Sequence, residues 1–395
     1  MGAGPDWLAR LLAGGVSRIL DRIDASLETG SIRTTLPDGS HRLLGGREPG
    51  FDAVVRLNSY RSLLRLATGG SIGWFQVRQE GEWESPDPVP LFALFMANAS
   101  ALGNIGRAHG PWRWAMRLLH HLRRNTRAGS MRNIHAHYDL GNDFYEAWLD
   151  PTMSYSSARF APGDSLEQAQ QRKLETIAAR LDGASQVLEI GCGWGALAHH
   201  LAQGGAHVTA ISLSDEQLAF ARAHHADPAI EFRKQDYRDT QGSFDGVVSV
   251  EMVEAVGRAF WPAYFDCITR NLKPGGRAAI QYIAMRDDLF DAYARSADFI
   301  QAYIFPGGLL VSEREFRKLA EERGLEWCDR EGFALDYAET LRQWRERFDR
   351  AVAEHSLAAG FDREFVDLWR YYLMYCEGGF RGLGIDVAQV TLIKR

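Results

Sequence analysis

Residues 186–195 read Gln-Val-Leu-Glu-Ile-Gly-Cys-Gly-Trp-Gly, and this stretch decides the fold. The apolar run predicts a buried strand, the three glycines predict a tight turn, and the residues from Ala196 onward predict a helix. Glycine lets the backbone approach a ligand closely, and the N-terminus of the following helix offers free N–H groups. A strand, a glycine-rich turn and a helix in this order therefore predict a cofactor site in an α/β protein.

The glycine turn could serve a dinucleotide or another nucleotide, and two features argue against NAD or FAD. Trp194 lies inside the glycine pattern, which leaves less room for a pyrophosphate than the usual dinucleotide pattern. The next predicted strand, 207–211, runs into Ser-Leu-Ser-Asp at 212–215, without a clear acidic ligand for the ribose.

The segments around this motif extend the pattern. Residues 165–181 predict a helix before it, and residues 244–250 predict a buried parallel strand after it. Residues 271–276 (NLKPGG) predict the end of a helix and a turn into a strand over 277–282. A glycine loop, this strand and this turn in order resemble the class I S-adenosylmethionine (SAM) methyltransferases, with a Rossmann-like α/β fold.

Composition bounds the remaining choices. The chain has 395 residues, 46% of them hydrophobic, with 45 Lys and Arg against 51 Asp and Glu. These values exclude a disordered or fibrous chain, and the net charge of −6 argues against a nucleic-acid binder. The four cysteines are far apart and lack metal-ligand spacing, so we expect neither disulfides nor a metal site. No apolar run is long enough to span a bilayer and the N-terminus does not resemble a secretory signal, which predicts a cytoplasmic protein.

The N-terminal part predicts a separate, smaller domain. Residues 7–23 have apolar side chains at helical spacing, which fits a helix packed on its own domain or a helix on a membrane surface. Residues 31–83 contain short β-like runs separated by turn signals, and a helix begins near Pro90. We expect a small α+β domain.

Residues 107–137 differ in composition from the rest of the chain. They contain seven Arg, five His and no Asp or Glu, with Trp112 and Trp114 among the arginines. Arginine beside tryptophan on an otherwise acidic protein fits an anionic phospholipid surface. The alternative is an interdomain helix whose arginines pair with acidic neighbours.

From residue 130 onward the chain resembles the cyclopropane-fatty-acyl-phospholipid synthases and the related mycolic acid cyclopropane synthases. The motifs that carry this resemblance are HYDLGNDFY (137–145), LDPTMSYS (149–156), EIGCGWG (189–195), QDYRD (235–239), YIFPGG (303–308) and the tail around 371–381. The resemblance implies an accessory lipid-binding domain over 1–106, a basic linker over 107–136 and a SAM-dependent methyltransferase domain over 137–395.

Such enzymes transfer the SAM methyl group to a cis double bond in a phospholipid acyl chain. A base then removes a proton, and in the family this base is a bicarbonate held by Cys, Glu, His and Tyr side chains. The resemblance assigns the glutamate to Glu254 and the tyrosine to Tyr337. The alternatives are that Glu254 is a solvated glutamate on a helix and that Tyr337 is a packed core tyrosine. Cys376 matches a cysteine often counted as catalytic, and we interpret it as a packed wall residue because cation chemistry needs no thiolate.

Two positions depart from the family pattern. The family cysteine is Ser157 here, and the family histidine is Gln281. Glutamine cannot titrate or carry charge, so bicarbonate binding is doubtful and the cation can lose its proton elsewhere. The departures therefore predict a methyl-branched or methylene product beside cyclopropane.

For SAM, the resemblance implies that Asp236 accepts a hydrogen bond from the adenine amino group, with Tyr237 beside the ring. Gln217 takes the ribose role, and Asp215 is the runner-up. The predicted SAM residues are Tyr155, Ser156, Gly191, Cys192, Gly193, Gly195, Ser212, Leu213, Gln217, Asp236 and Tyr237.

The predicted partners are an anionic bilayer surface and unsaturated acyl chains, without nucleic acid. We expect peripheral association with the inner face of the membrane, and a homodimer is left as an option. Two alternatives remain at this point: a catalytically silent lipid-binding protein and a small-molecule methyltransferase on the same fold.

Overall fold

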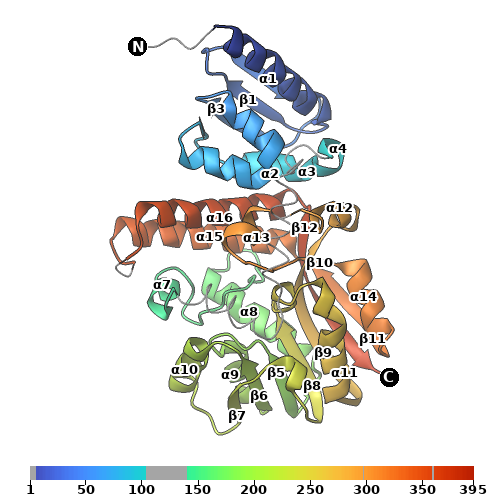
Figure 1. The fold of residues 1–395 in the computed structure, drawn as a ribbon. Coiled ribbons are helices and arrows are strands. Elements are labelled where there is room, and N and C mark those ends of the chain that lie inside the picture. Colours follow the sequence, from blue (N-terminus) through green and yellow to red (C-terminus); the bar gives the residue numbers. More distant parts are fainter. Residues whose placement is uncertain (1–5, 104–139, 297, 358–359) are drawn as a thin grey trace. The chain divides into compact units, whose positions relative to one another are not determined.

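Two compact units make up the chain, each assembled from separate segments (Figure 1). The computed structural model describes residues 6–103, 140–296, 298–357 and 360–395. Unit 1 draws on residues 1–122, 291–304 and 362–384, and unit 2 on residues 123–290, 305–361 and 385–395.

This grouping differs from a division in chain order at residues 106 and 136. Two helical segments of the C-terminal third belong to unit 1, and a close helix contact explains one of them. A Cβ added at Gly378 would lie 2.4 Å from Cβ of Phe92, and one at Gly382 would lie 2.5 Å from the carbonyl oxygen of Ala93. Glycine therefore lets these two helices pack backbone against backbone. The predicted linker 107–136 lies outside the described residues.

Unit 1 contains a four-stranded sheet in the order β2-β1-β3-β4. Strand β3 runs parallel to β1, whereas β2 and β4 are antiparallel to their neighbours. Its strands are β1 (Ser31–Thr35), β2 (His41–Gly45), β3 (Asp52–Leu57) and β4 (Trp83–Glu84). Its helices are α1 (Asp6–Ser26), α2 (Arg61–Gln79), α3 (Val89–Ala97), α4 (Ala99–Leu102), α13 (Phe299–Tyr303) and α16 (Arg363–Arg381). The predicted α+β character of this part is confirmed.

The predicted N-terminal helix is present as α1. Val16, Leu20 and Ile23 are buried, and the Asp24 carboxylate accepts a hydrogen bond of 2.7 Å from the Gly45 N–H of β2. From Val16 onward, the apolar stripe therefore packs on its own unit. Residues 61–79, which the turn signals placed between β-like runs, form the helix α2 with a non-helical kink at Gly70.

Unit 2 contains the larger sheet, in the order β11-β12-β9-β8-β5-β6-β7. Strands β5 to β9 are parallel, β12 is antiparallel to β9, and β11 is antiparallel to β12. The strands are β5 (Gln186–Ile190), β6 (His207–Ser212), β7 (Ile230–Lys234), β8 (Phe244–Val250), β9 (Leu272–Met285), β10 (Val311–Ser312), β11 (Leu325–Gly332) and β12 (Ile385–Lys394). The predicted Rossmann-like α/β class is confirmed.

Helices cover this sheet and connect its strands. They are α7 (Asn142–Glu146), α8 (Leu166–Ala179), α9 (Ala196–Gln203), α10 (Asp215–His224), α11 (Trp261–Asn271), α12 (Asp287–Tyr293), α14 (Glu313–Glu321) and α15 (Ala334–Ala353), with short 3₁₀ turns η1 (Tyr237–Asp239), η2 (Val253–Ala255) and η3 (Arg258–Phe260). The predicted strand 277–282 is longer in the structure, because the segment from Leu272 already pairs with Phe244 of β8.

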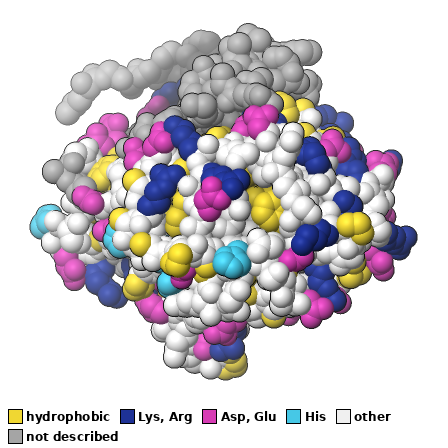
Figure 2. All heavy atoms as spheres, turned by 90° about the horizontal axis from the view of Figure 1, so that it is seen from below, with side chains coloured by type: hydrophobic (Ala, Val, Ile, Leu, Met, Phe, Trp, Pro, Cys, Tyr) yellow, Lys and Arg dark blue, Asp and Glu magenta, His cyan; other side chains and the backbone are white. Residues whose placement is uncertain are grey.

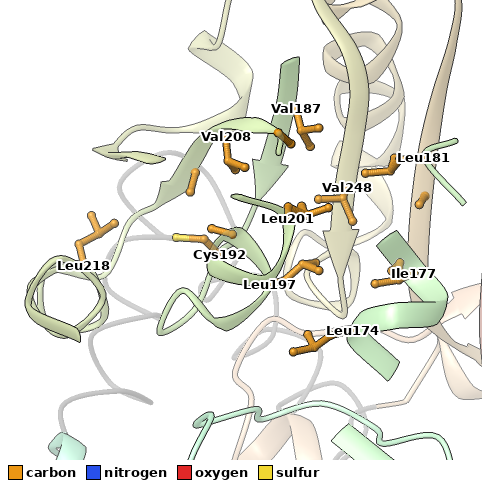
Figure 3. Close-up of a cluster of buried hydrophobic side chains, with 14 residues drawn as sticks. Leu174, Ile177, Leu181, Val187, Cys192, Leu197, Leu201, Val208, Leu218 and Val248 are labelled. Carbon is orange, nitrogen blue, oxygen red and sulfur yellow. The ribbon is translucent and has the colours of Figure 1, made fainter. Parts of the chain in front are cut away.

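A buried apolar cluster joins α8 and α9 to the central strands (Figure 3). Burial of each such aliphatic side chain stabilises the fold by about 1.5–3 kcal/mol. Its labelled members are Leu174, Ile177, Leu181, Val187, Cys192, Leu197, Leu201, Val208, Leu218 and Val248. Cys192 of the glycine loop after β5 belongs to this cluster, which therefore fixes the position of the loop. Among the described helices, none combines the length and apolar character needed to cross a bilayer.

Candidate active site

The glycine loop follows β5 at the point where the strand order of the sheet reverses. Gly191, Gly193 and Gly195 have φ angles of +83°, +52° and +94°, in the left-handed region that glycine adopts without steric cost. A Cβ at Gly191 would also lie 2.7 Å from Cγ of Met252, whereas one at Gly193 meets no atom within 4 Å. Gly193 therefore faces open space.

That space is a cavity of about 200 Å³ at the carboxyl ends of the central strands, where ligands of open α/β sheets bind. Nine of the eleven predicted SAM residues line it: Tyr155, Ser156, Gly191, Cys192, Gly193, Ser212, Leu213, Gln217 and Tyr237. Gly195 does not line the cavity; it precedes α9, and a Cβ there would crowd Ala221 at 3.0 Å.

Asp236 is the other predicted SAM residue that does not line the cavity. Its carboxylate accepts hydrogen bonds from the backbone N–H and Nε of Arg238 at 2.9 and 2.8 Å. Its neighbours Gln235 and Tyr237 do line the cavity. Hydrogen bonding of Asp236 to adenine therefore stays a prediction. The runner-up for the ribose, Asp215, forms an ion pair with Lys234.

Two buried charged residues that the sequence analysis missed, Lys173 and Glu189, also line the cavity. Nζ of Lys173 donates to Oγ of Ser156 at 3.0 Å, and burial lowers the pKa of Lys173. Burial raises the pKa of Glu189 to about 8, and its Oε2 has no hydrogen-bond partner among the described residues. The sequence did contain a signal for Lys173, because this charged residue lies next to Leu174 on the buried, mostly apolar face of α8.

These groups fit SAM. The unpartnered oxygen of Glu189 can accept from the ammonium of the methionine part, and Lys173 with the N–H groups before α9 can hold its carboxylate. Gln217 and Ser212 offer polar atoms for the ribose, and Tyr237 offers a ring face for adenine. The described residues contain no group of three or more His, Cys, Asp or Glu placed to hold a metal ion.

Glu251 is a second carboxylate that the sequence analysis missed. It accepts hydrogen bonds from three predicted catalytic residues. Its Oε1 accepts from the backbone N–H of Ser157 at 2.9 Å and from Nε2 of Gln281 at 2.7 Å. Its Oε2 accepts from the hydroxyl of Tyr337 at 2.7 Å. Glu251 also lines the cavity, directly after β8. No local motif marks it, because its partners come from three distant parts of the chain.

The orientation of the Gln281 amide is set by a further contact. Nε2 of Gln389, on β12, donates to Oε1 of Gln281 at 3.0 Å, and Nε of Arg180 donates to Oε1 of Gln389 at 3.1 Å. With its oxygen engaged in this way, Gln281 presents its NH₂ group to Glu251.

Glu254 lies on η2, close enough to Glu251 for their charges to interact. Its Oε1 accepts from the backbone N–H of Ile283 at 2.5 Å, and its buried Oε2 has no partner among the described residues. Burial and the nearby charge of Glu251 raise the pKa of Glu254 to about 8. Its neighbours Met252 and Ala255 line the cavity, but Glu254 does not.

Cys376, the fifth predicted catalytic residue, lies on α16 in unit 1. Burial raises the pKa of its thiol far above the usual value, which disfavours a thiolate. Its role as a wall residue stays a prediction.

Comparison with known proteins gives a consistent result. Residues 125–390 match the family described as mycolic acid cyclopropane synthetase. Tuberculostearic acid methyltransferase UfaA1 of Mycobacterium tuberculosis is 38% identical over 98% of this chain and 92% of its own length. Cyclopropane-fatty-acyl-phospholipid synthase of Escherichia coli is 34% identical over 87% of this chain and 88% of its own.

A solved structure agrees with these matches. Mycolic acid cyclopropane synthase CmaA1, complexed with SAH and CTAB, has a TM-score of 0.62 at 27% identity, over 67% of this chain and 98% of that one. The chain therefore belongs to the mycolic acid cyclopropane synthetase family and is a SAM-dependent methyltransferase.

Proposed function

We propose that this enzyme transfers the SAM methyl group to a double-bond carbon of an unsaturated fatty acyl chain in a membrane phospholipid. The observation that carries the proposal is the buried, hydrogen-bonded carboxylate of Glu251 at the wall of the SAM cavity. The names of its relatives, which describe a tuberculostearic acid methyltransferase and a cyclopropane-fatty-acyl-phospholipid synthase, support the same substrate class.

An alkene is a weak nucleophile, so the site must align it with the donor and stabilise the cation that forms. SAM supplies an electrophilic methyl group on a sulfonium. Aromatic faces near the cavity suit the cation. Tyr155 lines the cavity, and its ring centroid lies 5.4 Å from that of Trp344 and 5.5 Å from that of Tyr145. Trp344 in turn meets the ring of Tyr337, which binds Glu251.

The reaction also needs a negative charge near the cation and a group that accepts a proton. Glu251 offers negative charge to the cation and an acceptor for the proton that the chain must lose. Gln281 carries no charge in the position of the family histidine, so we expect methyl-branched or methylene chains at least as abundant as cyclopropane.

Membrane contact through residues 107–137 is a second part of the proposal, and it rests on their composition. On the face drawn in Figure 2, Lys and Arg lie interspersed with Asp and Glu, and hydrophobic side chains form only small spots among the described residues. The composition of residues 107–137 makes this segment our candidate for contact with anionic headgroups on the inner face of a membrane.

Mass spectrometry tests the proposal. The purified enzyme is incubated with methyl-deuterated SAM and vesicles of phosphatidylglycerol that carry cis-monounsaturated chains, and the acyl chains are analysed. We expect chains that carry one SAM-derived carbon. SAM binding by calorimetry without any labelled chain, from mono- or diunsaturated phospholipids, would instead indicate the silent lipid-binding alternative.

A further inference from the structure

Glu251 has a backbone conformation that a glutamate rarely adopts. Its φ angle is +47°, in the left-handed region where a Cβ approaches the following carbonyl oxygen. Such strain persists where surrounding contacts maintain it, and it is concentrated at functional sites. Glycine would adopt this conformation without strain, but it has no side chain. The glutamate at this position places a carboxylate at the wall of the cavity.

Several groups around Glu251 interact favourably with its ionised carboxylate. Three donors converge on its two oxygens, from Ser157, Gln281 and Tyr337. Lys173 is also close enough for its charge to favour the carboxylate form. Burial is the largest effect and raises the pKa of Glu251, while the hydrogen bonds from Gln281, Ser157 and Tyr337 oppose this rise. A raised pKa suits a carboxylate that accepts a proton.

The same geometry leaves no place for a separate bicarbonate. The donors of Ser157, Gln281 and Tyr337 that could bind such an anion are satisfied by Glu251. A second anion at this point would lie against the carboxylate of Glu251, in a buried environment where like charges repel strongly. The residues present therefore do not fit bicarbonate.

We propose that Glu251 itself is the base that takes the proton from the methylated acyl chain, in place of a bound bicarbonate. This inference rests on the proposed function, because it names the base for that same reaction.

The reaction balances with groups already named. The π electrons of the acyl double bond form a bond to the methyl carbon while the carbon–sulfur bond breaks, its electron pair stays on sulfur, and the other alkene carbon becomes cationic. Glu251 then accepts one proton. If the proton leaves the new methyl group, the freed pair closes the cyclopropane ring or, after a hydride shift, forms a methylene group. If it leaves a neighbouring chain carbon, the pair forms a new double bond beside the methyl branch. Glu251 finally releases the proton to water.

Two substitutions at Glu251 separate the base from the backbone. Glu251→Gln keeps the size of the side chain and removes its basicity. Glu251→Gly relieves the left-handed backbone, removes the carboxylate and exposes the three donors to a small anion. Asp182→Gly is the matched control, because Asp182 is also acidic, also has a positive φ of +53°, and is 70% exposed in an ion pair with Arg277.

Turnover is measured in buffer depleted of carbon dioxide, with and without added bicarbonate. We expect wild type and Asp182→Gly to be independent of bicarbonate. Glu251→Gln should lose at least 100-fold in turnover in both buffers. Glu251→Gly should lose a similar amount and regain at least 10-fold with bicarbonate. Full turnover by Glu251→Gln, or a wild type that requires bicarbonate, would overturn the proposal.

Two measurements do not depend on turnover. NMR of ¹³C-bicarbonate with the ligand-free proteins should show saturable binding by Glu251→Gly and none by wild type; saturable binding by wild type would contradict the inference. Circular dichroism and thermal unfolding should show that all four proteins are folded. If wild type methylates no unsaturated phospholipid, the proposed function fails, whereas the NMR result still reports on the anion site.

Discussion

Nε2 of Gln281 lies 2.7 Å from Oε1 of Glu251, a hydrogen bond between the ends of two neighbouring parallel strands, β8 and β9. The pair joins a predicted catalytic residue to one that the sequence analysis did not predict. Because the Gln281 amide is neutral, it donates to Glu251 without placing a cation at this position.

Gln281→His combined with Glu251→Gly should shift the products toward cyclopropane, since an imidazolium then faces the space that Glu251 leaves and favours a bound anion there. Ser157→Ala should leave the products unchanged, because Ser157 meets Glu251 through its backbone N–H. With methyl-deuterated SAM, mass spectrometry distinguishes cyclopropane or methylene, with two deuteria, from a methyl branch with three. Wild-type product that is purely cyclopropane, and unchanged in the double variant, would show that position 281 does not steer the product.

Tyr337→Phe should move the acidic limb of the pH–rate profile to higher pH. The Tyr337 hydroxyl lowers the pKa of Glu251, so its loss raises that pKa and leaves the base protonated over a wider range. Lys173 and Glu254 are unchanged in the variant and act on Glu251 in both proteins. At neutral pH we expect a loss of about 10–100-fold, from about 1.5–3 kcal/mol for a hydrogen bond to a charged group. A profile of unchanged shape would assign Tyr337 to packing.

Glu189→Gln should weaken SAM binding by about 10–100-fold, because the ammonium of SAM loses a charged hydrogen-bond acceptor. Isothermal titration calorimetry gives the affinity directly. Glu175→Gln, on the exposed side of α8, is the matched control and should bind SAM as wild type does. Equal affinity in both variants would remove Glu189 from the cofactor site.

Glu254 should make the ligand-free fold less stable as the pH rises. Its pKa is about 8 in the folded protein and 4.5 in its ordinary state, so the unfolded chain loses this proton first. Its contribution is complete below about pH 4.5 and is lost as the pH rises through 8. Thermal unfolding between pH 5 and 8.5 should show a smaller decline for Glu254→Gln than for wild type. Lys173 titrates in both proteins, so parallel curves would contradict the buried acid.

Activity should require anionic vesicles and should decline with salt. The arginines of 107–137 are expected to interact with headgroups over a Debye length of about 8–10 Å. Vesicle sedimentation of Arg123→Gln with Arg124→Gln should show weaker binding to phosphatidylglycerol. Arg317→Gln with Arg363→Gln, both exposed in the wild type, is the charge-matched control. Equal binding to phosphatidylcholine and phosphatidylglycerol at low salt would exclude this role.

The family resemblance named nine of the residues that line the cavity. The strand, glycine turn and helix beside that cavity were predicted from local patterns, because they are consecutive in the chain. The strand 244–250 and the fold class followed from the same local signals. Glu251 was not predicted, because its role depends on Ser157, Gln281 and Tyr337, which are close only after folding. The structure groups the segments 291–304 and 362–384 with unit 1. A division in chain order does not anticipate this grouping, because helix α16 meets α3 through glycines whose spacing carries no local signal.

The position of β12 in the sheet has a consequence for protein synthesis. Residues 385–394 lie between β9 and β11, and they carry the Gln389 that orients Gln281. The ribosome makes this strand after every other strand of the sheet, so β11 has no partner in the sheet until it arrives. We therefore expect a nascent chain to form the glycine loop first, and to orient Gln281 beside Glu251 only after residues 385–394 have been made and have paired with β9.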